Sequence, residues 1–189
     1  MLDWLKKDAV GYTQLHAAGK SGYDKVPKEL LTAANLTIKD DFKCTSIHYA
    51  ADCGHLNELP QHILTAEAIT MKNSGGWTAI HNAARSGHLD QIPEALLTVE
   101  NMMLEELAGR TPFFLSAISG HIDQVPLGLD FPESVMNGVR ECNWSGINPT
   151  KAISRANVAE EWWTRNQEIL SEKMQLDEGL AEAPEIELF

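Results

Sequence analysis

A short motif returns four times along the first two thirds of this 189-residue chain, at an almost constant interval. The four copies are Thr13-Gln14-Leu15-His16, Thr45-Ser46-Ile47-His48, Thr78-Ala79-Ile80-His81 and, in weaker form, Thr111-Pro112-Phe113-Phe114. Their threonines lie 32, 33 and 33 residues apart. Self-similarity at such a period is typical of repeat architectures, in which each unit buries its apolar face against the next unit. The chain is therefore expected to fold as a stack of units.

Two further positions recur in each copy. A glycine stands nine residues after each threonine, and a proline follows at steps of 33 residues. They are Gly22, Gly54, Gly87 and Gly120, and Pro27, Pro60, Pro93 and Pro126. The first copy has one residue fewer between glycine and proline, so Tyr23 stands where the later copies have His-Leu or His-Ile.

Each copy predicts two short antiparallel helices joined by a tight turn. Small and apolar residues follow the threonine at helical spacing, and the glycine is expected to end this first helix in the left-handed conformation. A second helix is expected to begin near Asp24, Asn57, Asp90 or Asp123, which are good N-cap residues, with the proline in its first turn. Leucine and isoleucine pairs would bury this second helix, and Thr32, Thr65 and Thr98 would mark its end.

The T-x-[LI]-H-x-A-[AG]-x-x-G pattern at this period resembles the ankyrin repeat. The resemblance covers about residues 11–136, with four repeats at about 11–42, 43–75, 76–108 and 109–141, the last with a loosened end. It departs from the common form in the first repeat's deletion, in Phe113-Phe114 and in the recurring proline. The resemblance implies an all-α solenoid, a curved stack of helix pairs with projecting hairpin loops, which binds other macromolecules and has no catalytic site of its own.

Atypical segments are expected to cap both ends of such a stack. Residues 1–10 predict an N-terminal cap with one short helix, because Leu2, Leu5 and Ala9 have helical spacing and Trp4 lies beside them. Residues 142–176 predict a degenerate fifth repeat that starts at Gly146-Ile147-Asn148-Pro149 and ends in a long capping helix, roughly Val158 to Leu176. The apolar stripe of that helix is expected to cover the open end of the stack. It comprises Trp162, Ile169 and Leu176, with Trp163, Leu170 and Met174 alongside.

Residues 177–189 form an acidic tail with five carboxylates and no basic residue, which is typical of a disordered segment. Two other interpretations stay open. Pro184-Glu185-Ile186-Glu187-Leu188-Phe189 is also a candidate docking peptide, because its three apolar side chains suit a hydrophobic groove. The tail is also similar to the export signals of bacterial effectors that are delivered into host cells.

Charge and cysteine content limit the partners and the compartment. The chain has 15 Lys and Arg against 27 Asp and Glu, a formal net charge of −12, so nucleic acid is not an expected partner. No stretch is long and apolar enough for a signal peptide or a membrane span, so no membrane partner is expected. Three cysteines, Cys44, Cys53 and Cys142, indicate a reducing compartment. A cytoplasmic location is therefore expected, or a host cell if the protein is an exported effector.

Catalytic motifs are absent from the sequence. It contains no phosphate-binding loop, nucleophile elbow, zinc-protease motif or glycine-rich dinucleotide loop. The resemblance implies structural hydrogen bonds to loop backbone for His16, His48 and His81. The prediction is a protein that is not an enzyme and has no cofactor and no metal. The alternative is a thiol- or metal-dependent enzyme or redox sensor that uses Cys44, His48, Cys53 and His55, although their spacing matches no usual zinc pattern.

The resemblance also implies where a partner would bind. The variable contact positions precede the threonine, precede the turn of each loop, and follow the small residues of the first helix. On the concave face these positions give seven candidate partner-binding residues: Tyr12, Asp41, Phe42, Asp52, Trp77, Arg85 and Arg110. Aromatic residues and arginine dominate the energetics of protein interfaces, so the expected function is protein–protein interaction.

Three further expectations concern this face. Its acidic candidates lie toward the N-terminal half and its arginines toward the C-terminal half, which predicts a charge gradient. Phe42 and Trp77 have the alternative of packing on a neighbouring loop. Lys43 replaces the turn glycine of the second repeat, so that loop is expected to have a different shape. The sequence is compatible with a monomer and leaves self-association open.

Overall fold

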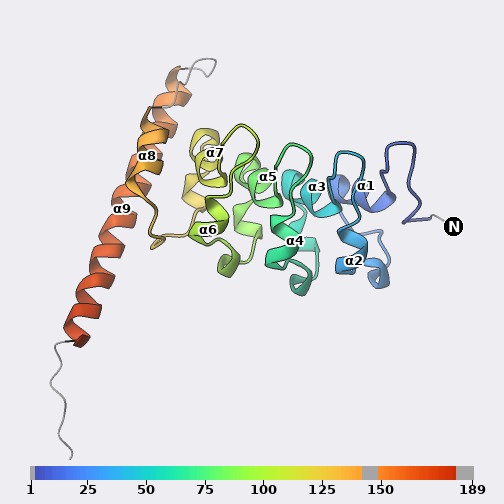
Figure 1. Ribbon diagram of the computed structural model, residues 1–189, viewed down its shortest axis with the longest axis horizontal. Helices are drawn as coiled ribbons and strands as arrows, with labels where there is room; N and C mark the ends of the chain where they lie inside the picture. The colour runs from blue at the N-terminus through green and yellow to red at the C-terminus, as the bar shows by residue number, and fades with distance from the viewer. Residues whose placement is uncertain (1–2, 142–148, 182–189) are drawn as a thin grey trace, which may run out of the picture.

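The structure, a computed structural model, describes residues 3–141 and 149–181. Within these ranges it contains nine α-helices, six short 3-10 helices and no strand, which confirms the predicted all-α fold. The elements form an elongated stack that ends in one long helix (Figure 1). Residues 1–2, Cys142, Gly146-Ile147-Asn148 and the Pro184–Phe189 peptide lie outside the described residues.

The first helix of each repeat has the same eight-residue length. These inner helices are α1 (Gln14–Ser21), α3 (Ser46–Cys53), α5 (Ala79–Ser86) and α7 (Pro112–Ser119). Each begins after the repeated threonine, whose extended backbone makes it the N-cap residue. Gly54, Gly87 and Gly120 end their helices in the left-handed conformation, as predicted. Gly22 has φ 97° and ψ 156° instead, at the repeat that lacks one residue after the glycine.

The three motif histidines accept a hydrogen bond at the start of an inner helix and donate one to the next loop. In α5, the backbone N–H of Thr78 donates to His81 Nδ1 over 3.2 Å, so Nδ1 is the acceptor and Nε2 carries the proton. Nε2 then donates to the carbonyl oxygen of Arg110 over 3.3 Å. His48 binds the Trp77 carbonyl and His16 the Cys44 carbonyl in the same way, at 3.1 and 3.2 Å. The structural role that the resemblance implies is thereby confirmed.

The second half of each repeat differs from the predicted helix. In the second repeat, 3-10 helices Leu56–Glu58 and Gln61–Ile63 precede the short helix α4 (Ala66–Thr70). The third repeat has 3-10 helices Leu89–Gln91 and Glu94–Leu96 before α6 (Val99–Met102), and the first has Lys28–Leu30 before α2 (Ala33–Leu36). The fourth repeat keeps one 3-10 helix, Ile122–Gln124.

Proline explains this difference. Its ring excludes helical backbone from the preceding residue, and Leu59, Ile92 and Val125 accordingly have extended ψ angles of 146°, 135° and 128°. The proline therefore interrupts the segment instead of lying in the first turn of a helix. The predicted roles of Thr32, Thr65 and Thr98 are also wrong, because these threonines begin α2, α4 and α6 as N-cap residues and do not end a helix.

Neighbouring repeats pack through their inner helices and stack through their loops. Leu15, Ile47, Ile80 and Phe113 occupy equivalent positions and are fully buried. Gly19 permits close approach, because a Cβ there would lie 2.5 Å from the Ser46 carbonyl oxygen. The loops join in register through backbone hydrogen bonds, such as the one from Ser74 N–H to the Phe42 carbonyl over 2.8 Å. The loops and inner helices thus form one continuous surface.

The C-terminal end holds α8 (Glu133–Arg140) and the 33-residue helix α9 (Pro149–Ala181). A single helix therefore replaces the two expected from Pro149 onward, and it continues past Asp177, where disorder was predicted. Trp162 and Trp163 of α9 are both buried, and the Trp162 indole donates to the Val125 carbonyl over 3.0 Å. The predicted stripe is only partly right, because Met174 and Leu176 are 64% and 69% exposed.

The N-terminal segment has turns where a capping helix was expected. Residues 3–10 contain no helix. Trp4 is half-buried and packs against the hydrophobic core. The segment then joins the first loop, in which the backbone N–H of Tyr12 donates to Asp8 Oδ1 over 2.9 Å. Local turn chemistry at Asp8 therefore outweighs the weak helical pattern of the sequence.

Candidate functional site

The predicted contact residues lie on one surface. We call it the loop face: it comprises the four loops at residues 8–12, 40–44, 73–77 and 106–110, together with the inner helices beside them. Tyr12, Trp77 and Arg110 end their loops immediately before an inner helix, and Asp52 and Arg85 lie in the last turns of α3 and α5. The rise of loops above the row of inner helices is visible in Figure 1. This is the surface that the resemblance predicts to be concave.

Trp77 is the centre of one cluster on the loop face. The guanidinium carbon of Arg85 lies 4.8 Å from the Trp77 ring centroid, and that of Arg110 lies 5.4 Å from it. Both distances are within the range of a cation–π interaction. Trp77 is half-buried and packs against the hydrophobic core, and its alternative of packing on a neighbouring loop stays a prediction. Residues from two repeats thus hold one indole ring with part of its surface exposed.

Both arginines of this cluster also have carboxylate partners. Arg85 Nη2 lies 2.6 Å from Asp52 Oδ1, and Arg110 Nε lies 2.9 Å from Glu106 Oε1. Burial raises the pKa of the Glu106 carboxyl, but the Arg110 side chain and the backbone N–H groups of Ala108 and Arg110 outweigh it and lower that pKa to about 2. Part of the charge on the loop face is therefore paired within the protein, and the charge gradient along this face stays a prediction.

A second cluster surrounds Tyr12. Its ring stacks on His16 at a centroid distance of 5.1 Å and meets the edge of Tyr49 at 5.6 Å. The Lys20 amine lies 4.5 Å from the Tyr49 centroid and 5.4 Å from that of Tyr12. The Tyr49 hydroxyl donates to Asp40 Oδ2 over 2.7 Å. Burial raises the pKa of Tyr49 most, and the hydrogen bond to this carboxylate raises it further.

Tyr49 and Asp40 were not among the predicted contact residues, whereas Lys20 stands at one of the predicted contact positions, after the small residues of its inner helix. One sequence signal was available for Tyr49: it follows the motif histidine, where the other copies have Ala17, Asn82 and Leu115. An aromatic ring at that position reaches the loop face instead of the core. The Tyr12 and Trp77 clusters share one composition, in which aromatic rings lie under cationic groups.

The loop tips carry exposed apolar side chains. Phe42 is 63% exposed, so its alternative of packing on a neighbouring loop is wrong, and Asp41 beside it is also exposed. The expected change of shape at Lys43 is wrong as well. Its φ of 58° is close to the 71°, 78° and 74° of Gly11, Gly76 and Gly109, so a lysine adopts the left-handed turn that glycine makes in the other loops.

The cysteine and histidine set does not form a chemical site. Both ring nitrogens of His48 are already engaged, by Thr45 and by the Trp77 carbonyl. Burial raises the pKa of the Cys44 thiol and of the Cys53 thiol, which disfavours the reactive thiolate. His55 Nδ1 lies 2.7 Å from Glu58 instead of facing Cys53. Among the residues that the structure describes, no three His, Cys, Asp or Glu side chains are grouped to hold a metal ion.

Comparison with known families agrees with the repeat geometry. A family model described as ankyrin repeats (3 copies) matches residues 47–127. No curated protein matches the chain. Ankyrin repeats are in general protein–protein interaction modules and are typically non-catalytic. Within the described part of the chain, no helix combines the length and apolarity needed to cross a membrane. The family match, the helix pairs and the histidine-bound loops together show that residues 47–127 of this chain consist of ankyrin repeats.

Proposed function

We propose that the protein binds a partner protein through the loop face and catalyses no reaction on it. The observation that carries the proposal is the Trp77 cluster, in which a partly exposed indole ring lies near two guanidinium groups. Tryptophan and arginine are the residues most enriched among the energetic hot spots of protein interfaces. No other cluster of described residues combines these types on the loop face.

The geometry of the cluster suits a partner with carboxylate and apolar side chains. The Arg85 and Asp52 side chains are 48% and 37% exposed, so their ion pair is accessible to solvent and contributes little stability, about 0–1 kcal/mol. A partner carboxylate can replace Asp52 at Arg85 at a small energetic cost. An apolar partner side chain would then cover the exposed part of the Trp77 ring.

The rigidity of the loops favours such binding. His48 donates to the carbonyl of Trp77, and His81 donates to that of Arg110, so the backbone of both contact residues is fixed to the preceding inner helix. Binding to an ordered surface loses less conformational entropy than binding to a mobile one. Phe42 and the Tyr12 cluster extend the same surface toward the N-terminal repeats.

The test is affinity capture from a lysate of the native cells. Wild-type protein is compared with the double variant Trp77→Ala/Arg85→Glu and with a matched control, Lys28→Glu/His62→Ala, which alters two exposed residues outside the loop face. Circular dichroism establishes that all three proteins are folded. We expect one captured protein to be lost with the Trp77 variant and kept with the control. Capture that persists with the Trp77 variant would overturn the proposal.

A further inference from the structure

The outer packing of the stack changes in the fourth repeat. In each of the first three repeats a 3-10 helix follows the repeated proline, and it leads into an apolar pair, Leu30-Leu31, Ile63-Leu64 or Leu96-Leu97. The fourth repeat has Leu129-Asp130 at the positions of this pair. Among the described residues, no 3-10 helix follows Pro126. The regular outer packing therefore ends where the third repeat meets the fourth.

A hollow of about 380 Å³ lies at this place, between the outer segments of the third and fourth repeats. We call it the outer hollow. Its apolar lining comes from Leu89, Ile92, Leu97, Val125, Pro126 and Leu127. Pro126 and Leu127 are half-buried, and the other four side chains are buried. Pockets that bind ligands usually have volumes of about 300–1,000 Å³, so the outer hollow has room for side chains of a short peptide segment.

The outer hollow is separate from the loop face. The helices α5 and α7 each begin at a loop and end at Gly87 and Gly120, and the lining residues of the outer hollow follow these glycines. A helix of eight residues is about 12 Å long, which separates the start of each outer segment from the loop. Figure 1 shows α4 and α6 on the opposite side of the inner helices from the loops. A partner in the outer hollow therefore leaves the loop face free.

The charged side chains that line the outer hollow are all acidic. They are Asp90, Glu94 and Asp123, and all three are exposed. None of the ion pairs found in the described part of the structure includes one of these carboxylates. The surrounding sequence has the same sign, because residues 86–139 contain eight acidic residues and one basic residue, Arg110, which belongs to the loop face. The outer hollow therefore combines an apolar lining with negative charge.

Two cations of α9 lie beyond the outer hollow. Arg165 lines an adjacent hollow of about 330 Å³ together with Glu161, whose charge is opposite. Lys173 Nζ lies 3.4 Å from the carbonyl oxygen of Gly128. Neither cation is part of the lining of the outer hollow, which keeps a single sign of charge.

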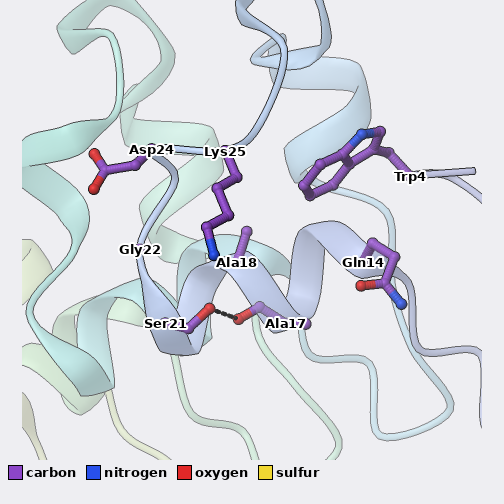
Figure 2. A pocket seen from close by; sticks show the side chains of 8 residues that line it. All are labelled: Trp4, Gln14, Ala17, Ala18, Ser21, Gly22, Asp24 and Lys25. Atoms are coloured by element: carbon purple, nitrogen blue, oxygen red, sulfur yellow. Dashed lines mark hydrogen bonds between the residues drawn. The ribbon is translucent and has the colours of Figure 1, made fainter. Parts of the chain in front are cut away.

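The hollows at the N-terminal end of the stack have charges of both signs. The hollow in Figure 2, of about 420 Å³, has Lys25 and Asp24 in its lining. Figure 2 shows the Lys25 amine directed toward Ala18, whereas the Asp24 carboxylate points away from it. A second hollow at this end is lined by two lysines and two aspartates, Lys6, Lys7, Asp3 and Asp8. Charge therefore selects no occupant at the N-terminal end, whereas at the outer hollow it selects a cation.

We propose that the outer hollow binds a cationic segment of a partner protein, in which an apolar side chain stands between lysine or arginine residues. The apolar side chain fills the hollow and covers Leu127, and the cationic groups pair with the three carboxylates. The loop face is proposed to bind carboxylates, so the two surfaces select segments of opposite charge. Because the surfaces are separate, binding at the outer hollow does not depend on the function proposed for the loop face.

The test is a fluorescence anisotropy titration of a labelled synthetic peptide, Lys-Leu-Lys-Leu-Lys, with the full chain up to about 1 mM. Asp90→Asn/Asp123→Asn removes two carboxylates of the hollow and keeps the size of the side chains. Glu67→Gln/Glu100→Gln is the matched control, because it removes two negative charges from exposed residues that do not line the outer hollow. Circular dichroism establishes that all three proteins are folded.

We expect wild type and the control to bind the peptide alike, and the Asp90→Asn/Asp123→Asn variant to bind it at least about fivefold more weakly. A peptide with serine in place of leucine should also bind wild type more weakly, because it leaves the apolar lining uncovered. Equal affinity of the variant and the control, or no binding to wild type up to about 1 mM, would overturn the proposal. Sedimentation of the proteins without peptide tests a second copy as the occupant. Self-association of wild type that is lost in the Asp90→Asn/Asp123→Asn variant would assign the hollow to that copy and would also overturn the proposal.

Discussion

Three buried histidine rings are expected to make the repeat stack sensitive to acid. His16, His48 and His81 are almost fully buried, and this burial lowers the pKa of each ring. For His81, desolvation outweighs the opposing effect of its backbone hydrogen bonds and lowers the pKa to about 4, from 6.5 in the unfolded chain. As the pH falls through this window, the unfolded chain binds a proton that the folded state excludes. The free energy of unfolding therefore decreases from about pH 6.5 down to about pH 4.

The size of the His81 contribution follows from the two pKa values. At pH 5 most unfolded chains carry the proton on this ring, whereas about one folded chain in ten does. The linkage relation then gives a loss of about 2 kcal/mol at pH 5 relative to pH 8 for His81 alone. This is a large part of the stability of an ordinary domain, about 5–15 kcal/mol.

Urea unfolding at pH 8, 7, 6 and 5 measures this loss. His81→Gln removes the titrating ring, so the stability lost between pH 8 and pH 5 should be smaller than in wild type by about 2 kcal/mol, whatever the variant's stability at pH 8. His62→Gln is the matched control, because it makes the same substitution at an exposed histidine that holds no loop. If His81→Gln and wild type lose the same stability over this range, the burial argument is refuted.

Other substitutions also have expected outcomes. Lys43→Gly should raise the free energy of unfolding by about 0.5–1 kcal/mol in urea titrations, because φ is positive at this position. Gly109→Ala should lower the free energy of unfolding by a similar amount, because φ is positive there too, although a Cβ would meet no atom within 4 Å. Glu106→Gln should reduce the stability that the protein loses between about pH 4.5 and about pH 2, since the low pKa of Glu106 stabilises the fold above that window. Acid titration followed by circular dichroism measures this loss, and the same loss in the variant and in wild type would contradict the prediction. Trp162→Ala should destabilise the protein by about 3–5 kcal/mol in thermal unfolding, and a shift below about 1 kcal/mol would contradict its place in the core.

The repeat register could be predicted because it is set by contacts that recur. Each motif threonine caps an inner helix, and the histidine three residues later binds both the threonine N–H and the next loop. Neither role can shift by one residue without losing its partner, so the spacing is visible in the sequence. The same contacts explain why the motif is weak in the fourth copy. The chain there leads into α8 and not into another loop of this type, so a histidine would have no loop to hold, and Phe114 takes its place.

The second half of each repeat was harder to predict because two local rules compete. An aspartate or asparagine followed three residues later by proline fits a helix start, but proline also excludes helical backbone from the residue before it. The extended backbone of Leu59 shows that the second rule prevails. At the chain ends, apolar spacing alone could not distinguish a covered stripe from an exposed one, since Met174 lies beyond the stack while Trp162 lies on it.

The positions of the candidate contact residues could be predicted from the sequence, but the side-chain contacts between them could not. Trp77 and Arg110 stand at equivalent places one repeat apart, which the period gives directly. Asp52 and Arg85 are also one repeat apart, so the period places them side by side, but it does not encode that their side chains form an ion pair. The position of the Tyr49 ring was not predictable either, because it depends on contacts with Tyr12 and Asp40, which two different loops bring to it.

The histidines that stabilise the stack also connect its stability to binding. The carbonyl groups that His48 and His81 hold belong to Trp77 and Arg110, two residues of the proposed contact cluster. A proton added at Nδ1 of either ring would oppose the threonine N–H that donates to it, so protonation would break the helix cap and loosen the ring that fixes the loop. Acid would then free the backbone of the contact residues before the whole stack unfolds. Partner binding through the loop face is accordingly expected to weaken at a higher pH than the one at which global helix content is lost.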